Sequence, residues 1–379
     1  MPVRLPPAPR SPSVFPRPLR GAIAWHTFPS ACLRGNPLGD PSERELPVYL
    51  PPSGRTEGLP LVVLLSGYTG TGPLHFQRPR YLAESRAQQF DRLIVSGRMP
   101  EAVMVAPDAR TTLGGSQYLN SAATGRYDDY VTKEVVPWVR ERYRTGPVGV
   151  VGTSSGGFGA LSLAMRHPEV FRAAASDSGD MYFDYCYLPE FPVAARTIRR
   201  AGGTDRLLRR IFGGPVDGLG PGSPESTALE MMAYASCYSP VPRDPGAFEL
   251  PFDLETGALL PAVWRRWLAF DPVRMLAVAR YREALRRCWY VYLDAGGSDE
   301  WFLDLGARIF AARSRALGIP VDWREFSGRH GDVARRYDAI FPGVVRALRR
   351  GGSDGPLRTD LPRGRPTRRR SRPPPTRGR

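Results

Sequence analysis

The sequence predicts an α/β fold in which a mostly parallel central sheet is flanked by helices. Short apolar runs typical of buried strands alternate with segments that carry apolar residues at helical spacing. The chain has 379 residues, enough for one large domain with an insertion. The first two strands below are expected to pair as a hairpin. Strands are expected at residues 45–50, 61–65, 102–106, 148–151, 172–176, 287–294 and 321–326, and the main helices at 126–142, 158–165, 302–317 and 333–349.

The strand at 148–151 leads into a glycine-lined turn. This turn is the main feature from which a function is predicted. Residues 152–156 read Gly-Thr-Ser-Ser-Gly and match the Gly-x-Ser-x-Gly pattern of a nucleophile elbow. A sharp strand-to-helix turn lifts the middle serine above the sheet, and a Cβ at either flanking position would collide with neighbouring backbone. The pattern predicts Ser154 as the nucleophile of an α/β-hydrolase fold. The alternative is a tight turn with a purely structural role.

A serine nucleophile needs a base, and the four histidines of the chain make the search short. In this fold the acid and the histidine follow the serine in the sequence. His26 and His75 precede Ser154, and His167 stands at the far end of the helix that leaves the elbow, about 20 Å away. His330 remains, in a loop between a predicted strand and a predicted helix. The alternative for His330 is a surface histidine in a glycine-containing loop.

The acid that orients the histidine is expected after the strand at 287–294. Three carboxyl groups compete there, Asp294 at the strand end and Asp299 and Glu300 in the following turn. A residue in the turn can reach across the edge of the sheet, so Asp299 is the preferred candidate. Asp294 is more suited to bracing the backbone amides of the turn.

Two backbone amides are expected to form an oxyanion hole. The amide of Ser155 directly follows the nucleophile. The second should come from the glycine-rich loop at 66–72, which follows the strand at 61–65, and Tyr68 is the predicted donor.

The polar loop at 108–120 follows another strand of the sheet. Loops at that edge line the ligand site of open α/β sheets. Tyr118 and Asn120 are therefore candidate substrate contacts, and structural hydrogen bonding is the alternative role.

Residues 184–280 do not alternate strand and helix. An insertion at this place predicts a cap over the serine, with an excursion remote from the pocket as the alternative. The aromatic segment at 248–270 contains Trp264 and Trp267, which are expected to influence the choice of substrate.

These residues carry a resemblance to a known family. The chain resembles the esterase family of α/β-hydrolases that includes esterase D, feruloyl esterase domains, enterochelin esterases and the antigen 85 mycolyltransferases. The similarity covers residues 34–348. The segments that carry it are Gly-Ser-Gln-Tyr-Leu-Asn at 115–120, Ser-Ser-Gly-Gly-Phe-Gly at 154–159, Gly-Asp-Met-Tyr-Phe at 179–183 and Leu-Gly-Ala-Arg-Ile at 305–309.

The resemblance implies a catalytic triad of Ser154, Asp299 and His330, the same residues that the pattern of the chain favours. Two positions depart from the family. Ser66 stands where the family usually has histidine, and Arg329 stands where it often has a second glycine before the histidine. A backbone donor does not depend on the first change, whereas the second bears on the conformation of the loop that holds His330.

The formal charge of +16 resides mostly at the two ends of the chain. Residues 1–20 contribute +4 and residues 351–379 contribute +7, which leaves +5 for the rest. Specific nucleic-acid binding is therefore not predicted. We expect an irregular extension rich in proline and arginine at 1–33, a catalytic domain at 34–350 and a disordered basic tail at 351–379.

The remaining composition predicts a cytoplasmic enzyme without cofactor or metal. The start of the chain lacks the apolar run of a signal peptide, and no apolar stretch of about 18 residues could span a membrane. The four cysteines lack metal-ligand spacing and are expected to be free thiols.

The sequence therefore predicts a serine hydrolase that cleaves a small carboxylic ester and transfers the acyl group to water. An acyltransferase with the same triad and a binding protein on a hydrolase fold are the alternatives.

Overall fold

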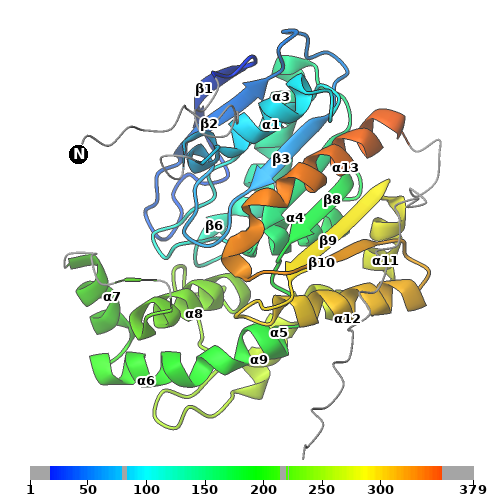
Figure 1. Cartoon of the computed structure of the whole chain (residues 1–379). Helices are drawn as coiled ribbons and strands as arrows, with labels where there is room; N and C mark the ends of the chain where they lie inside the picture. Colours follow the sequence, from blue (N-terminus) through cyan, green and yellow to red (C-terminus); the bar gives the residue numbers. More distant parts are fainter. Residues whose placement is uncertain (1–17, 79–82, 214–218, 221, 352–379) are drawn as a thin grey trace, which may run out of the picture.

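The computed structural model describes residues 18–78, 83–213, 219–220 and 222–351 (Figure 1). An eight-stranded sheet forms its centre, in the order β1-β2-β4-β3-β7-β8-β9-β10. Strands β4, β3, β7, β8, β9 and β10 run parallel, which confirms the predicted class, whereas β2 is antiparallel to both of its neighbours. The strands are β1 (Ala22–Pro29), β2 (Glu43–Leu50), β3 (Leu61–Leu65), β4 (Val103–Val105), β7 (Val148–Thr153), β8 (Phe171–Asp177), β9 (Tyr290–Gly296) and β10 (Asp322–Phe326). A separate ribbon joins β5 (Asn120–Ser121) to β6 (Gly125–Arg126).

Two predictions about the N-terminal part of the chain are wrong. The extension at 1–33 was expected to be irregular, but β1 forms the edge of the sheet there. Most of this edge strand stays partly exposed, so its sequence lacks the apolar run of a central strand. The expected hairpin between β2 and β3 is absent because β4 lies between them, and the two edges of β3 are taken by β4 and β7.

The side chains of β3 show how the two faces of the sheet are covered. Leu61, Val63 and Leu65 enter one core cluster and Val62 and Leu64 enter another, as the two-residue period of a strand requires. The first cluster includes residues of helices α3, α4, α11 and α12, and the second includes residues of α1 and α13 (Figure 1). These helices are α1 (Arg86–Val95), α3 (Val136–Tyr143), α4 (Ser155–Arg166), α11 (Ala279–Arg287), α12 (Leu303–Ala316) and α13 (Tyr337–Arg350).

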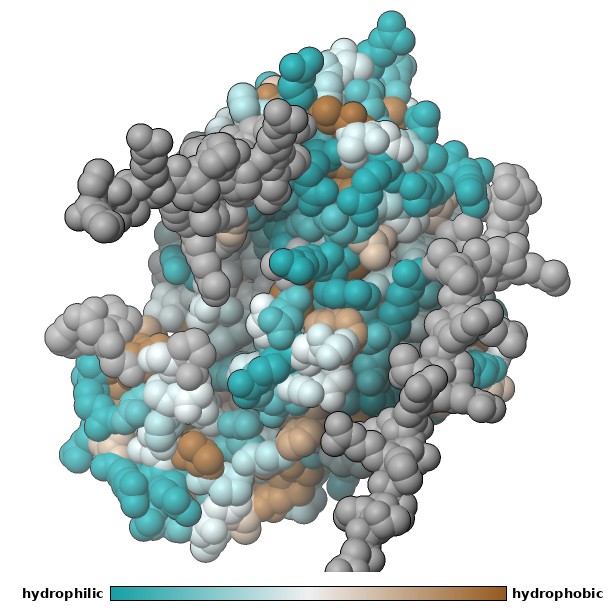
Figure 2. Space-filling model, viewed as in Figure 1, coloured by the Kyte–Doolittle hydropathy of each residue, from teal (hydrophilic) through white to brown (hydrophobic). Residues whose placement is uncertain are grey.

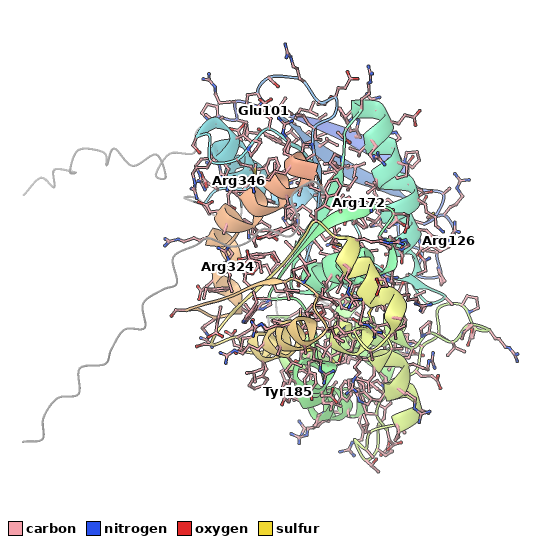
Figure 3. The ribbon with its side chains drawn as sticks, turned by 90° about the vertical axis from the view of Figure 1, so that its right-hand side faces the viewer. Glu101, Arg126, Arg172, Tyr185, Arg324 and Arg346 are labelled. Carbon is pink, nitrogen blue, oxygen red and sulfur yellow. The ribbon has the colours of Figure 1, made fainter. Side chains whose placement is uncertain are left out.

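A helical insertion connects β8 to β9 and has a core of its own. Figure 3 shows that it forms one end of the molecule, where Tyr185 lies, opposite the end with Glu101. Polar side chains cover much of the face shown in Figure 2, with scattered apolar side chains over the insertion. Its helices are α5 (Phe183–Cys186), α6 (Phe191–Ala201), α7 (Thr204–Gly213), α8 (Pro224–Tyr238), α9 (Pro261–Leu268) and α10 (Pro272–Met275).

The two tryptophans of α9 belong to this core, which corrects the expectation that they meet substrate. Trp267 is fully buried and Trp264 is 6% exposed. The ring of Trp267 lies 5.6 Å from that of Phe191 and 5.2 Å from that of Tyr238, and its Nε1–H donates to Ser239 Oγ at 2.8 Å. Both side chains pack in the core of the insertion and therefore leave no open surface for a ligand.

The described part of the chain contains no helix that is long and apolar enough to cross a membrane. The four cysteines form no disulfide. Almost all of the predicted basic tail and residues 1–17 of the predicted extension lie outside the described residues.

We expect Trp267→Ala to lower the free energy of unfolding by about 3–5 kcal/mol, because it leaves a large cavity in the core of the insertion. Denaturant unfolding followed by fluorescence and circular dichroism measures this loss. The control is Leu260→Ala beside the same helix, where the side chain is exposed and the expected change is within about 0.5 kcal/mol. Equal stability of the two variants would contradict the structural role.

Candidate active site

Ser154 joins β7 to α4 in a strained backbone conformation, with φ of 57° and ψ of −128°. L-residues seldom adopt this combination. A Cβ at Gly152 would lie 2.2 Å from the carbonyl oxygen of Gly156, and a Cβ at Gly156 would lie 2.5 Å from the carbonyl oxygen of Leu65. Glycine is therefore required at both positions, and the turn has the sharpness that the sequence pattern indicates.

His330 and Asp299 meet across a hydrogen bond, although 31 positions separate them in the chain. His330 Nδ1 lies 2.8 Å from Asp299 Oδ2, and the side chain of Asp299 is fully buried. The other oxygen, Asp299 Oδ1, accepts the backbone N–H of Trp301 at 3.0 Å. The indole of Trp301 also packs edge-on against the imidazole, with ring centres 4.8 Å apart. The imidazole is thereby held on two sides.

Two opposing effects set the pKa of His330. Burial lowers the pKa, but the hydrogen bond and the charge of Asp299 outweigh burial and raise it above 6.5, with smaller contributions from Asp180 and Glu300. No hydrogen bond joins Ser154 Oγ to His330 among the described residues. In hydrolases without substrate this bond is often long and tightens on binding.

The three candidate acids have different partners in the structure. Asp294 lies within β9, two residues before its end, where its Oδ2 pairs with Arg336 Nε at 2.7 Å and accepts the hydroxyl of Tyr292 at 2.7 Å. Its side chain is fully buried in these contacts. Asp299, not Asp294, therefore reaches the imidazole.

Glu300 stabilises the loop that contains His330 through two contacts. Its Oε2 accepts the backbone N–H of His330 at 3.0 Å, and its Oε1 pairs with Arg329 Nε at 2.7 Å. The side chain of Arg329 is 69% exposed and lies along the surface. The departure from glycine at this position therefore adds an ion pair to the loop without burying a bulky side chain beside His330.

The loop after β3 lies directly against the elbow. A Cβ at Gly67 would stand 3.3 Å from the Cβ of Ser154. The next residue, Tyr68, is anchored by its hydroxyl, which donates to the carbonyl of Leu113 at 2.9 Å. Its backbone N–H donates to no acceptor in the described ranges, and the N–H of Ser155 belongs to the first turn of α4, where helical amides lack partners. Both amides are available to an oxyanion.

Tyr118 supports this loop and also lines the small pocket that contains Tyr68 and Ser155. It is 4% exposed, and its hydroxyl donates to the carbonyl of Ser66 at 2.7 Å. Its ring fills the space beside Gly159, where a Cβ would come within 2.3 Å of it. Ser66 Oγ forms a second contact, with His75 Nε2 at 3.0 Å, and burial lowers the pKa of this histidine to about 3. His75 is thus neutral, and the serine that replaces the family's histidine holds the loop through it.

Asn120 also has a structural role. Its side chain is exposed on β5, and its Oδ1 accepts the backbone N–H of Asp129 at 3.1 Å. The predicted substrate contacts at Trp264 and Trp267 are therefore corrected to packing roles. Those at Tyr118 and Asn120 stay predictions, and the structure adds a structural hydrogen bond at each.

Several side chains near the elbow were missed by the sequence analysis. Ser155 Oγ contacts both Asp180 Oδ2 and the hydroxyl of Tyr234, and Glu230 follows on the same helix. Asp180 could have been suspected from the segment at 179–183, which carries the family resemblance. No signal in the sequence marked Tyr234, Glu230 or Trp301, because they approach the site only through the packing of the insertion and of the acid-bearing turn.

A mostly parallel sheet with a strained serine after β7 and a histidine after the last strand is the arrangement of the α/β-hydrolases. Within that class the chain belongs to the family described as Putative esterase, whose sequence model matches residues 41–334.

One known protein is similar in part of its sequence, and two solved structures share the fold. The MPT51 antigen of Mycobacterium leprae is 34% identical over 96 residues, which are 21% of this chain and 32% of that protein. The chain thus spans about a third of that relative. A ferulic acid esterase superposes with a TM-score of 0.54 at 19% identity, over 88% of this chain and 99% of the other. The S-formylglutathione hydrolase of Agrobacterium tumefaciens gives a TM-score of 0.52 at 16% identity, over 88% and 97%.

We expect Asp299→Asn to lower the pKa of His330, because the neutral amide no longer stabilises the imidazolium. An NMR titration of the four histidines measures the change. The raised pKa also implies that the pair contributes stability below pH 6.5, which is lost as the pH rises through the folded-state value. Asp299→Asn should remove this dependence.

Asp294→Asn is the matched control, since it alters a second buried carboxylate of the same segment. It should leave the titration of His330 in place and instead cost about 3–5 kcal/mol of stability, because Arg336 loses its charged partner. A larger shift of the His330 pKa in Asp294→Asn than in Asp299→Asn would contradict the assignment of the acid.

Proposed function

We propose that this protein is a serine hydrolase that cleaves carboxylic esters through an acyl-enzyme, with Ser154 as nucleophile, His330 as base and Asp299 as the acid that orients it. Membership of the esterase family supports ester chemistry. The observation that carries the finer assignment is the hydrogen bond between Asp299 and His330. These two residues follow β9 and β10 at the carboxyl edge of the sheet, the edge at which β7 leads into the strained Ser154.

The first half of the reaction would form the acyl-enzyme. Asp299 accepts a hydrogen bond from the Nδ1–H of His330, which leaves Nε2 unprotonated and free to take the proton of Ser154. Ser154 Oγ attacks the ester carbonyl, and the amides of Tyr68 and Ser155 would stabilise the oxyanion. His330 then gives the proton to the departing alkoxide, which leaves as the alcohol.

The second half would release the acid. His330 Nε2 takes a proton from water, the resulting hydroxide attacks the acyl carbonyl, and the same two amides bind the second oxyanion. The carbon–oxygen bond to Ser154 breaks as His330 returns the proton to Oγ, which restores the resting enzyme. Free thiols at all four cysteines support a reducing compartment such as the cytoplasm as the place of action.

A fluorophosphonate probe tests the nucleophile directly. We expect labelling of the wild type at Ser154 and none of Ser154→Ala, with peptide mass spectrometry to locate the adduct. His330→Ala should lower kcat on p-nitrophenyl butyrate by about 10⁴-fold or more, because triad residues act as one unit. A folded wild type that neither reacts with the probe nor hydrolyses p-nitrophenyl esters of any chain length would instead favour a binding protein on this fold.

Acyl transfer to an alcohol is the second candidate, because the family that the chain resembles includes the antigen 85 mycolyltransferases. Water at about 55 M competes with any alcohol unless the site binds the alcohol and excludes solvent. We therefore expect free butyrate as the main product when p-nitrophenyl butyrate is supplied with glycerol or trehalose. Predominant ester products at low millimolar sugar, resolved by mass spectrometry, would reassign the protein as an acyltransferase.

A further inference from the structure

Helix α8 of the insertion sends two polar side chains toward the elbow. The hydroxyl of Tyr234 lies 2.7 Å from Glu230 Oε1 and 3.1 Å from Ser155 Oγ. Ser155 Oγ in turn lies 3.2 Å from Asp180 Oδ2. A continuous chain of hydrogen bonds thus runs from Glu230 through Tyr234 and Ser155 to Asp180. It passes through the residue whose amide is proposed to bind the oxyanion.

The far end of this chain is firmly held. Asp180 is 4% exposed, and its Oδ2 also accepts the hydroxyl of Tyr187 at 2.9 Å and the amide Nε2 of Gln117 at 3.2 Å. A proton on Asp180 Oδ2 would compete with both donors. Burial raises the pKa of Asp180, and the hydrogen bonds from Tyr187, Gln117 and Ser155 oppose this rise. The donors at Oδ2 fit an unprotonated oxygen there, and the charge of Asp180 helps to raise the pKa of His330.

The hydrogen-bond chain from Glu230 to Asp180 needs one proton for each of its contacts. It has three contacts, and Tyr234 and Ser155 supply one proton each. When Glu230 is a carboxylate, Tyr234 must donate to it, and the single proton of Ser155 serves either Tyr234 or Asp180. One contact is then a repulsion between oxygen lone pairs. When Glu230 is a neutral acid, it donates to Tyr234, Tyr234 donates to Ser155, and Ser155 donates to Asp180, so all three contacts are satisfied.

The surroundings of Glu230 favour the neutral acid. Burial raises its pKa to about 7, against the hydrogen bond from Tyr234, and the nearby carboxyls of Asp180 and Glu190 raise it further while His330 lowers it. Helices α6 and α9 pack against α8. No arginine or lysine in the described part of the chain forms an ion pair with Glu230.

We infer that Glu230 and Tyr234 are positioning residues of the active site, which hold the oxyanion-hole residue Ser155 through a fully protonated hydrogen-bond chain from the insertion to Asp180. The inference rests on the proposed function. Loss of the proton from Glu230 breaks one link of the chain and adds a negative charge near the amide of Ser155. Both effects oppose the charge that develops on the oxyanion, so they act on the chemical step more than on substrate binding.

The pH profile of Glu230→Gln tests the role of the proton. Glutamine can still pair with Tyr234, but it cannot ionise. We expect kcat of the wild type to fall about 3- to 10-fold as the pH rises from near 7 to about 9, whereas Glu230→Gln stays within about 2-fold of its maximum. The rise on the acid side, which reports His330, should persist in both. An identical alkaline fall in both enzymes would overturn the inference.

Tyr234→Phe breaks the chain at its centre. The expected result is a loss of about 3- to 10-fold in kcat and in the rate of fluorophosphonate labelling, with KM nearly unchanged. The control is Tyr238→Phe, which removes a buried hydroxyl one turn further along α8 that makes no contact with Ser155. Equal kinetics of the two variants, with both folded by circular dichroism, would overturn the positioning role.

Labelling of the wild type distinguishes a failure of the inference from a failure of the proposed function. If Ser154 is labelled while Glu230→Gln and Tyr234→Phe behave as the wild type, the inference about the chain fails and the proposed function stands. If the wild type is not labelled and does not turn over esters, the proposed function fails and the inference fails with it.

Discussion

Ser154 keeps its strained backbone because three peptide segments meet beneath it with no side chains between them. Gly152 faces Gly156, Gly156 faces the end of β3, and a Cβ at Gly157 would lie 2.8 Å from the Cα of Gly179 in the loop after β8. This contact of backbone with backbone decides the rest of the site. The same approach that excludes a methyl group brings the amide of Tyr68 and the carboxylate of Asp180 to either side of the elbow.

A site residue could be predicted where it belongs to a contiguous motif, and was harder to predict where its partners lie far away in the sequence. Ser154 and its glycines form one contiguous motif, and His330 was found by elimination among four histidines. The preference for Asp299 over Asp294 rested only on reach, since the ion pair that occupies Asp294 comes from Arg336, far along the sequence. The prediction that Trp264 and Trp267 meet substrate is wrong, because an aromatic segment has the same composition in a helical core as on a cap. Burial alone distinguishes the two.

The insertion contributes side chains to the surroundings of the elbow. Its aromatic core holds α8 in place, and α8 delivers Tyr234 and Glu230 to Ser155. Substitutions deep in this core, far from any substrate, can act on the site by shifting α8. The sheet and the insertion are separate segments of the sequence. In the structure a hydrogen bond between Ser155 and Tyr234 joins them.

The position of the insertion also governs the order in which the chain can assemble. Strand β8 ends at Asp177, and its neighbour β9 begins only at Tyr290, so their pairing must close a loop that contains the whole insertion. During synthesis the elbow emerges long before Asp299 and His330, which stand on either side of the edge strand β10. The newly made chain thus contains Ser154 before His330 has been added, and the proposed triad can form only when the last strands dock.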